Sequence, residues 1–136
     1  MNLVRTFRTH HKLLYHIVFV TKYRKKILTK EMVKDINDII NRLSIKLDIK
    51  VIELNSEEDH IHLLIETIPK TRSLDRIVNV IKASTSKILR YKYSDIKKVL
   101  YGTNIGLWSK GYYVGTVGDV DIKRTIEYIK NQKEIK

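Results

Sequence analysis

The order of two repeating patterns constrains the fold of this chain more than any other feature of its sequence. Segments rich in β-branched and aromatic residues, typical of strands, alternate with longer segments whose apolar residues recur at helical spacing. The strand-like segments are residues 13–23, 50–54, 60–66 and 111–117. The helix-like segments are residues 29–47 and 73–93. This order predicts a ferredoxin-like, RRM-like α+β fold, in which an antiparallel four-stranded sheet carries its helices on one face.

Side chains at the ends of these segments support the boundaries. Thr29 and Ser73 are residue types that accept a hydrogen bond from the first turn of a helix. A polar turn is expected at residues 55–59, joining the second and third strands as a hairpin. A loop without periodicity is expected at residues 94–107, and one further helix at residues 121–133, beyond the ferredoxin-like unit.

Composition excludes several classes of protein. The 136 residues are 43% hydrophobic, which predicts one folded domain over residues 1–136. No apolar stretch approaches the roughly 18 residues of a spanning helix, and no secretory signal is found, so we expect a cytoplasmic protein without a membrane partner. The absence of cysteine limits any metal site to imidazole, carboxylate, amide or hydroxyl ligands.

The charge balance favours nucleic acid as the partner. Lys and Arg number 27 against 15 Asp and Glu, a formal net charge of +12. Such an excess attracts polyanions, and no basic amphipathic helix typical of membrane binding is found. On the second helix, the same basic residues would equally fit an ordinary solvated face. The candidate phosphate contacts are Lys22, Arg24, Lys25 and Lys26 after the first strand, and Lys82, Lys87 and Arg90 on the second helix.

Two histidines in the third strand predict a metal site. His60 and His62 stand two residues apart in an alternating run, so both side chains lie on one face, close enough to share an ion. The pattern also fits two polar residues on the outer face of an edge strand. Glu66 shares that face but lies far along the strand, whereas Asp59 falls on the opposite alternation and could hydrogen-bond an imidazole. The other candidates, expected to be DNA contacts or structural residues rather than ligands, are His10, His11 and His16.

The closing helix carries a tyrosine away from its apolar stripe. Ile122, Ile126 and Ile129 recur at helical spacing, whereas Tyr128 and Gln132 share a flank of the helix one turn apart. This placement makes Tyr128 a candidate nucleophile, although a boundary tyrosine with a solvated hydroxyl fits as well.

The junction before this helix is rich in glycine. Gly115 and Gly118 permit large changes of backbone dihedral angles, so they are candidate hinges that let the helix dock on its own sheet or on a partner subunit. Tyr112 and Tyr113 are rival nucleophiles in principle, but their place in the fourth strand favours a packing role.

Four pieces of the chain, in this order, resemble the HUH-superfamily single-tyrosine transposases, small enzymes that mobilise minimal bacterial insertion sequences as single-stranded DNA. The pieces read YHIVFVTKYRKK, EEDHIHLL, LWSKGYYVGTVG and TIEYIKNQ. The resemblance covers nearly the whole chain. No one piece is decisive, but four in this order in a chain of this length are specific.

The resemblance implies roles for particular residues. His60, His62 and Gln132 would bind Mg²⁺ or Mn²⁺, and Tyr128 would form a 5′-phosphotyrosine link while a 3′-hydroxyl is freed. The implied partners are single-stranded DNA with hairpin ends and a second subunit, each active site combining the histidines of one subunit with the tyrosine helix of the other.

The chemistry of these residues is consistent with that reading. Neutral imidazole and amide ligands leave a divalent ion its full charge, although a set without carboxylate is unusual for magnesium. No phosphate-binding glycine loop is present, so no nucleotide cofactor is expected. Two other functions stay open: a non-catalytic RNA-binding module with exposed aromatics on the central strands, and a replication-initiation nuclease of the same superfamily.

Overall fold

The structure, a computed structural model, describes residues 13–67, 73–100, 106–118 and 122–131. The strands are β1 (Leu13–Val20), β2 (Lys50–Glu57), β3 (His60–Thr67) and β4 (Tyr113–Thr116). The helices are α2 (Lys30–Leu47), α3 (Leu74–Lys92), α4 (Ser94–Val99) and α5 (Ile122–Lys130), and a single 3-10 turn, η1, covers Lys22–Arg24.

The four strands form one antiparallel sheet in the order β2-β3-β1-β4. This is the split βαββαβ arrangement predicted from the sequence, and β1 and β3 are its interior strands. The β2–β3 hairpin is also confirmed, but its expected turn at residues 55–59 is wrong. Strand pairing continues to Glu57 opposite His60, so only Glu58 and Asp59 form the turn.

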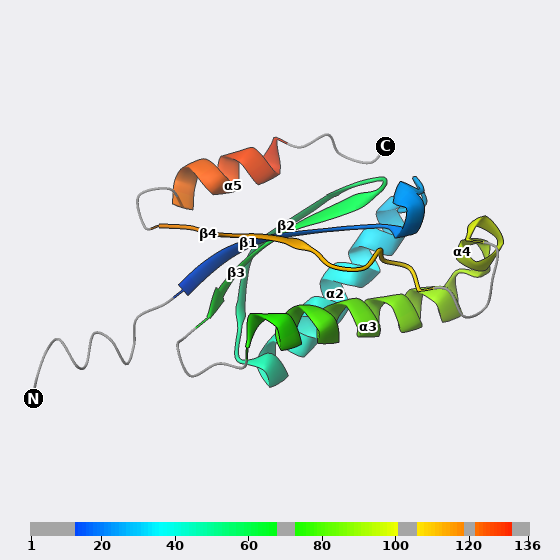
Figure 1. Cartoon of the computed structure of the whole chain (residues 1–136), viewed down its shortest axis with the longest axis horizontal. Helices are drawn as coiled ribbons and strands as arrows, with labels where there is room; N and C mark the ends of the chain where they lie inside the picture. The colour runs from blue at the N-terminus through cyan, green and yellow to red at the C-terminus, as the bar shows by residue number, and fades with distance from the viewer. Residues whose placement is uncertain (1–12, 68–72, 101–105, 119–121, 132–136) are drawn as a thin grey trace, which may run out of the picture.

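The two faces of the sheet are covered differently (Figure 1). Helices α2 and α3 lie side by side across one face, and α5 lies across the other. Ile17 and Phe19 of β1, with Ile61, Leu63 and Ile65 of β3, point toward α2 and α3 and are almost completely buried in the main core. Because side chains alternate along a strand, the residues between them point toward α5.

Both predicted helix caps are present. Thr29 Oγ1 accepts a hydrogen bond of 3.2 Å from the Met32 amide, and Ser73 Oγ accepts one of 3.3 Å from the Arg76 amide. These bonds satisfy amide groups that have no partner within the helix. Polar side chains therefore fix where the two core-facing helices begin.

Two further segments differ from expectation. The segment at 94–107 contains α4, a helix too short to show periodicity, anchored by the buried side chains of Ile96 and Leu100 one turn apart. Strand β4 is shorter than residues 111–117, because Gly111 adopts a left-handed φ of 78° and the strand begins after it.

Among the described helices, none is both long and apolar enough to cross a membrane.

The first strand also ends earlier than residue 23. After Val20 the chain enters η1, where Tyr23 and Arg24 have positive φ angles of 58° and 51°. Buried Thr21 fixes this turn, since its amide donates to the Asp59 carbonyl and its hydroxyl donates to the Lys25 carbonyl. The basic run is thus a rigidly attached turn beside the β2–β3 hairpin.

Candidate active site

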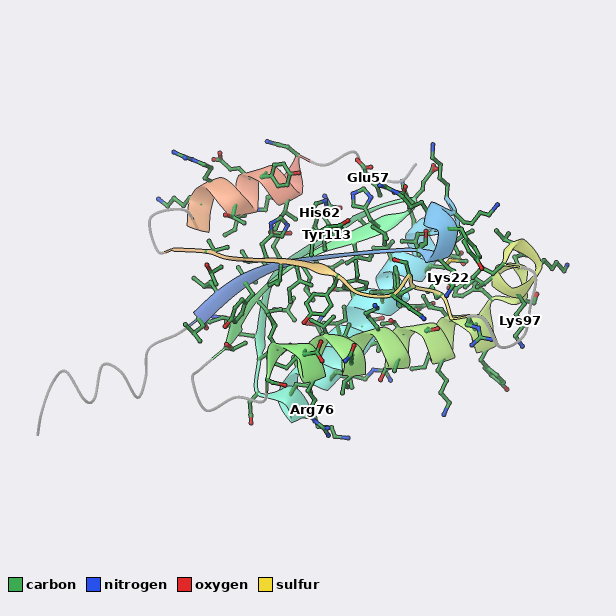
Figure 2. The ribbon with its side chains drawn as sticks, viewed as in Figure 1. Lys22, Glu57, His62, Arg76, Lys97 and Tyr113 are labelled. Carbon is green, nitrogen blue, oxygen red and sulfur yellow. The ribbon has the colours of Figure 1, made fainter. Side chains whose placement is uncertain are left out.

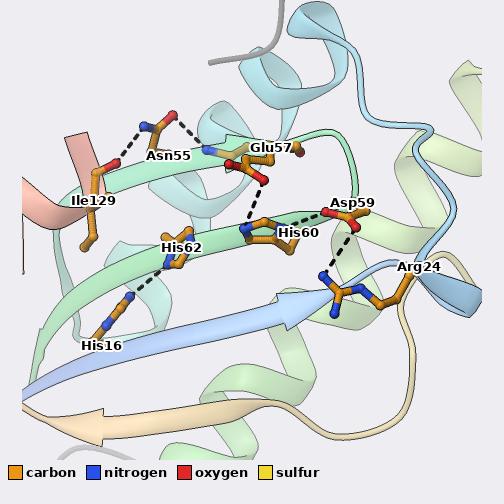
Figure 3. A network of polar contacts seen from close by, with 9 residues as sticks. His16, Arg24, Asn55, Glu57, Asp59, His60, His62 and Ile129 are labelled. Atoms are coloured by element: carbon orange, nitrogen blue, oxygen red, sulfur yellow. Dashed lines mark hydrogen bonds and ion pairs between the residues drawn. The ribbon is translucent and has the colours of Figure 1, made fainter. Parts of the chain in front are cut away.

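His60 and His62 lie on the same face of β3, as the alternation predicted. Their ring centroids are 4.9 Å apart, and both point away from the face covered by α2 and α3 (Figure 3). The alternative of an edge strand is wrong, because β3 is paired on both sides, with β2 and with β1. We call this side of the sheet, which carries His16, His60 and His62, the histidine face.

The first histidine is fixed through one ring nitrogen. His60 Nδ1 lies 2.7 Å from Asp59 Oδ1, and Arg24 forms an ion pair of 3.4 Å with the other carboxylate oxygen of Asp59. Burial opposes ionisation of Asp59, but the hydrogen bond with His60 and the charges of His60 and Arg24 outweigh it and lower the pKa of that carboxyl. Asp59 therefore stays ionised and keeps the proton of His60 on Nδ1. The predicted hydrogen bond between Asp59 and an imidazole is confirmed, with the carboxylate accepting.

The second histidine is fixed in the same way by another histidine. His62 Nδ1 lies 3.0 Å from His16 Nε2, and the two rings stack with centroids 5.3 Å apart. Burial lowers the pKa of His16. Sequence reasoning left His16 among DNA-contact or structural residues, since only the register of β1 against β3 shows that it is a diagonal neighbour of His62.

Tyr128 reaches this cluster from α5. Its ring lies edge-on to those of His62 and His16, with centroids 5.7 Å and 6.0 Å away. The Tyr128 side chain is 53% exposed, whereas Ile129 beside it is fully buried. This confirms that the tyrosine lies off the apolar stripe of the helix. Here the helix and the histidines belong to one chain.

Polar contacts attach α5 to its own sheet. The Asn55 side chain donates a hydrogen bond of 2.7 Å to the Ile129 carbonyl (Figure 3), and Lys130 lies 3.9 Å from a carboxylate oxygen of Glu53. Both β2 residues lie on the histidine face, opposite His62 and Leu64. Helix α5 is thus held on the histidine face by polar contacts on either side of the buried Ile129 side chain.

Beside the histidines lies a carboxylate, that of Glu57, which the sequence analysis did not include among the candidate ligands. Glu57 pairs with His60 across the hairpin, and its carboxylate lies 3.8 Å from His60 Nε2. Ligand atoms of Glu57, Asp59 and His60 all lie within 4.8 Å of one another, a grouping able to hold a metal ion. Assigning residues 55–59 to a turn concealed Glu57, which a longer second strand would have placed opposite His60.

The other predicted ligands are not part of this grouping, and among the described residues His62 too lies outside it, next to His60 on the same face. Glu66 lies further along β3, paired with Leu14 and Lys50. Gln132, His10 and His11 lie outside the described residues.

The predicted phosphate contacts fall into two regions. Lys22, Arg24, Lys25 and Lys26 surround η1 at the histidine end of the hairpin, and the last three are exposed. Lys87 and Arg90 lie on α3, which covers the opposite face of the sheet.

Lys82 on the same helix has a structural contact. Its ammonium donates hydrogen bonds of 2.8 Å to the carbonyls of Ser109 and Gly111, and burial lowers its pKa despite the charge of Asp75. This attaches α3 to the segment that leads into β4.

The two rival tyrosines lie in different surroundings, and the second of them, Tyr113, is labelled in Figure 2. Tyr112 is half-buried against the core, and its hydroxyl donates to Asp75 at 3.2 Å, which confirms a packing role. The same prediction for Tyr113 is wrong: it is 73% exposed. Tyr113 pairs with Val18, which also pairs with His62, so it lies on the histidine face one strand beyond Val18.

Of the two candidate hinge glycines, one is paired in the sheet and the other lies beyond it. Gly115 is within β4, paired with His16, and a Cβ there would meet nothing within 4 Å. Gly118 follows the strand and is exposed.

The sheet does not fit the RNA-binding alternative. That reading requires exposed aromatics on the interior strands, but Tyr15 and Phe19 of β1 both point into the core beneath α2 and α3. Fold and site together define an α+β protein whose sheet presents paired histidines and a helix-borne tyrosine on one face.

Comparison with known protein families assigns the chain to one of them. The profile of the "Transposase IS200 like" family matches residues 9–132, and the chain belongs to that family of insertion-sequence transposases. It is 33% identical over 120 residues to the transposase for insertion sequence element IS200 of Salmonella typhimurium, covering 88% of this chain and 76% of that one. It is 27% identical over 124 residues to the ISDra2 transposase TnpA of Deinococcus radiodurans, covering 91% and 86%.

Solved structures agree in fold. A putative transposase from Deinococcus radiodurans superposes with a TM-score of 0.70 at 26% identity, covering 91% of this chain and 93% of the other. A REP-associated tyrosine transposase bound to a REP hairpin superposes with a TM-score of 0.63 at 10% identity, covering 86% and 64%. The second likeness supports the fold alone.

Proposed function

We propose that this transposase cleaves and rejoins single-stranded DNA at the ends of its insertion sequence through a covalent bond to Tyr128. The observation that carries the proposal is the joint placement of Tyr128, His62 and His60 on one face of the sheet, with the tyrosine ring against the histidine that a metal site would use. A boundary tyrosine that only covers apolar surface would not need to place its ring edge-on to two imidazoles.

The chemistry is a transfer of a phosphoryl group between oxygens. The Tyr128 phenolic oxygen, having lost its proton, attacks the scissile phosphorus while the bond from phosphorus to the 3′ oxygen breaks. The 3′ oxygen takes up a proton, and the 5′ phosphate stays esterified to Tyr128. A second 3′-hydroxyl then attacks this ester, releasing Tyr128 and restoring a phosphodiester, so no external energy source is required.

The residues present fit a divalent metal ion. Asp59 and His16 engage the Nδ1 atoms of His60 and His62, so Nε2 of each ring is the atom available as ligand. Glu57 adds a carboxylate oxygen beside His60 Nε2, the type of donor that Mg²⁺ and Mn²⁺ prefer. Gln132 is proposed as a further ligand. When bound, the ion would polarise a phosphate oxygen at the scissile bond.

The DNA partner is proposed to be a strand with hairpin ends. The REP-associated transposase, similar in fold, is described as bound to a REP hairpin. The cations around η1 lie next to Asp59 and therefore beside the site, where they can hold the backbone of a bound strand. Lys87 and Arg90, on the other side of the sheet, would contact a different segment of the same DNA.

We also propose a homodimer with composite active sites. Gly118 would allow α5 to leave its own sheet and dock in the same way on a partner. Gly115, paired in β4, would contribute only where the end of that strand opens.

The test uses the full chain with Mn²⁺ and a labelled single-stranded hairpin from the flanks of its own gene. A DNA–protein adduct that resists denaturation is expected with the wild type and not with Tyr128→Phe. Tyr91→Phe, a change at a 91% exposed tyrosine of α3, is the matched control and should retain the adduct. Persistence of the adduct in Tyr128→Phe would refute the nucleophile.

A further inference from the structure

We infer that His16 is a positioning residue, which holds His62 in the tautomer and orientation that present Nε2 to a metal ion. The inference rests on the proposed metal site and extends it by one residue on a different strand. It begins from the contact of 3.0 Å between His16 Nε2 and His62 Nδ1 (Figure 3).

The contact can exist in two forms. Either His62 Nδ1 carries the proton and donates it to His16 Nε2, or His16 Nε2 donates to an unprotonated His62 Nδ1. In the second form the proton of neutral His62 is on Nε2, which then has no lone pair for a metal. Only the first form is compatible with metal binding through Nε2. His16 must then act as the acceptor, with its own proton on Nδ1.

Packing holds the two rings in this relation. His62 is only 5% exposed, so its ring has little room to turn. The His16 ring stacks on it with an interplanar angle of 24°, and the Tyr128 ring lies edge-on to both. On its other side His16 faces Gly115, which has no side chain, so β4 does not set the position of the His16 ring.

The neighbouring histidine, His60, has a comparable hydrogen bond at its own Nδ1. Asp59 accepts from His60 Nδ1 at 2.7 Å, as a carboxylate commonly does for a metal-binding histidine. His16 does for His62 what Asp59 does for His60, with a neutral acceptor in place of a charged one. The two rings therefore differ in their outer partner: a carboxylate lies beside His60 Nδ1, and an imidazole lies beside His62 Nδ1.

Two substitutions of His16 distinguish its role as a hydrogen-bond acceptor from its role in packing. His16→Gln places an amide oxygen close to the position of Nε2 and can still accept from His62 Nδ1. His16→Leu fills similar space without an acceptor. Thr116→Val, on exposed β4 and outside the site, is the control for a change within the same sheet.

The first readout is Mn²⁺ affinity, measured by electron paramagnetic resonance of the full chain without DNA. His16→Leu should weaken binding about 10-fold to 100-fold, the usual effect of losing an outer partner of a metal-binding histidine. His16→Gln should stay within about 3-fold of the wild type, a small part of that range. Equal affinity of His16→Leu and wild type, or equal loss in both variants, would overturn the inference.

The second readout needs no metal. Nitrogen-15 spectra of the histidine rings in the metal-free wild type should show His62 protonated on Nδ1. Protonation of His62 on Nε2 overturns the inference, even if His16→Leu fails to fold. A wild type that binds no Mn²⁺ would refute the metal assistance proposed above, while the tautomer would still decide the role of His16.

Discussion

The two faces of this sheet belong to the same strands but differ in the side chains that they carry and in the helices that cover them. The face under α2 and α3 is closed by large apolar side chains that are almost completely buried. In the part of the chain that the structure describes, the histidine face is covered by the short helix α5, and the rings of His16, His60 and His62 on it are held by hydrogen bonds. Adjacent residues of β3 therefore lie in the core and on the histidine face in turn, because strand side chains alternate.

The largest expected effect on activity comes from His62. His62→Ala should reduce strand cleavage at least about 100-fold, as expected when metal assistance worth several kcal/mol is lost. The measurement is the rate of cleavage of a labelled strand under single-turnover conditions. Cleavage within a few-fold of wild type would show that the histidine face is not the reacting surface.

The largest expected effect on stability comes from the residue beside it. Ile61→Ala removes a fully buried side chain from the opposite face and should lower the free energy of unfolding by about 2–5 kcal/mol. Urea unfolding followed by circular dichroism measures this change. If Ile61→Ala and His62→Ala destabilise equally, the division between the faces is not as described.

A smaller effect is expected at the seat of α5. Asn55→Ala removes the bond to the Ile129 carbonyl, and a hydrogen bond of this kind contributes about 1 kcal/mol. Amides within α5 should then exchange with solvent about 5-fold faster, while those of α3 are unchanged. Asn79→Ala, which removes only a contact with Asp75 on α3, is the control. Unchanged exchange in α5 would mean that other contacts fix the helix.

The smallest effect lies in the helix layer and depends on pH. Asp35 accepts hydrogen bonds from Tyr93 and Lys92, and these, the Tyr93 bond first, lower its pKa below 3.8. A lowered pKa means that the contact stabilises the fold fully above about pH 4 and is lost as the pH falls through the folded pKa. Asp35→Asn should therefore flatten the acid end of the stability curve without changing DNA cleavage at neutral pH. An unchanged acid limb would contradict the contact.

Local patterns predicted most of the fold and half of the site. Helical spacing with Thr29 and Ser73 as caps located α2 and α3, and alternation placed His60 and His62 together. Helix geometry took Tyr128 off the apolar stripe.

The remaining features depend on pairing between distant segments. The place of His16 beside His62 follows from the register of β1 against β3, and that of Glu57 opposite His60 follows from a hairpin turn shorter than polar composition indicated. Helix α4 is a single short helix, and such a length leaves no periodic trace. Register and turn length are tertiary properties, which no single segment records.

The most direct test of the central claim locates the covalent bond between protein and DNA. The full chain is incubated with Mn²⁺ and the flanking hairpin strand, digested with nuclease and trypsin, and analysed by mass spectrometry. The account predicts a nucleotide 5′-phosphate on the peptide TIEYIK, which carries Tyr128. A modification on GYYVGTVGDVDIK, which carries Tyr112 and exposed Tyr113, would contradict it.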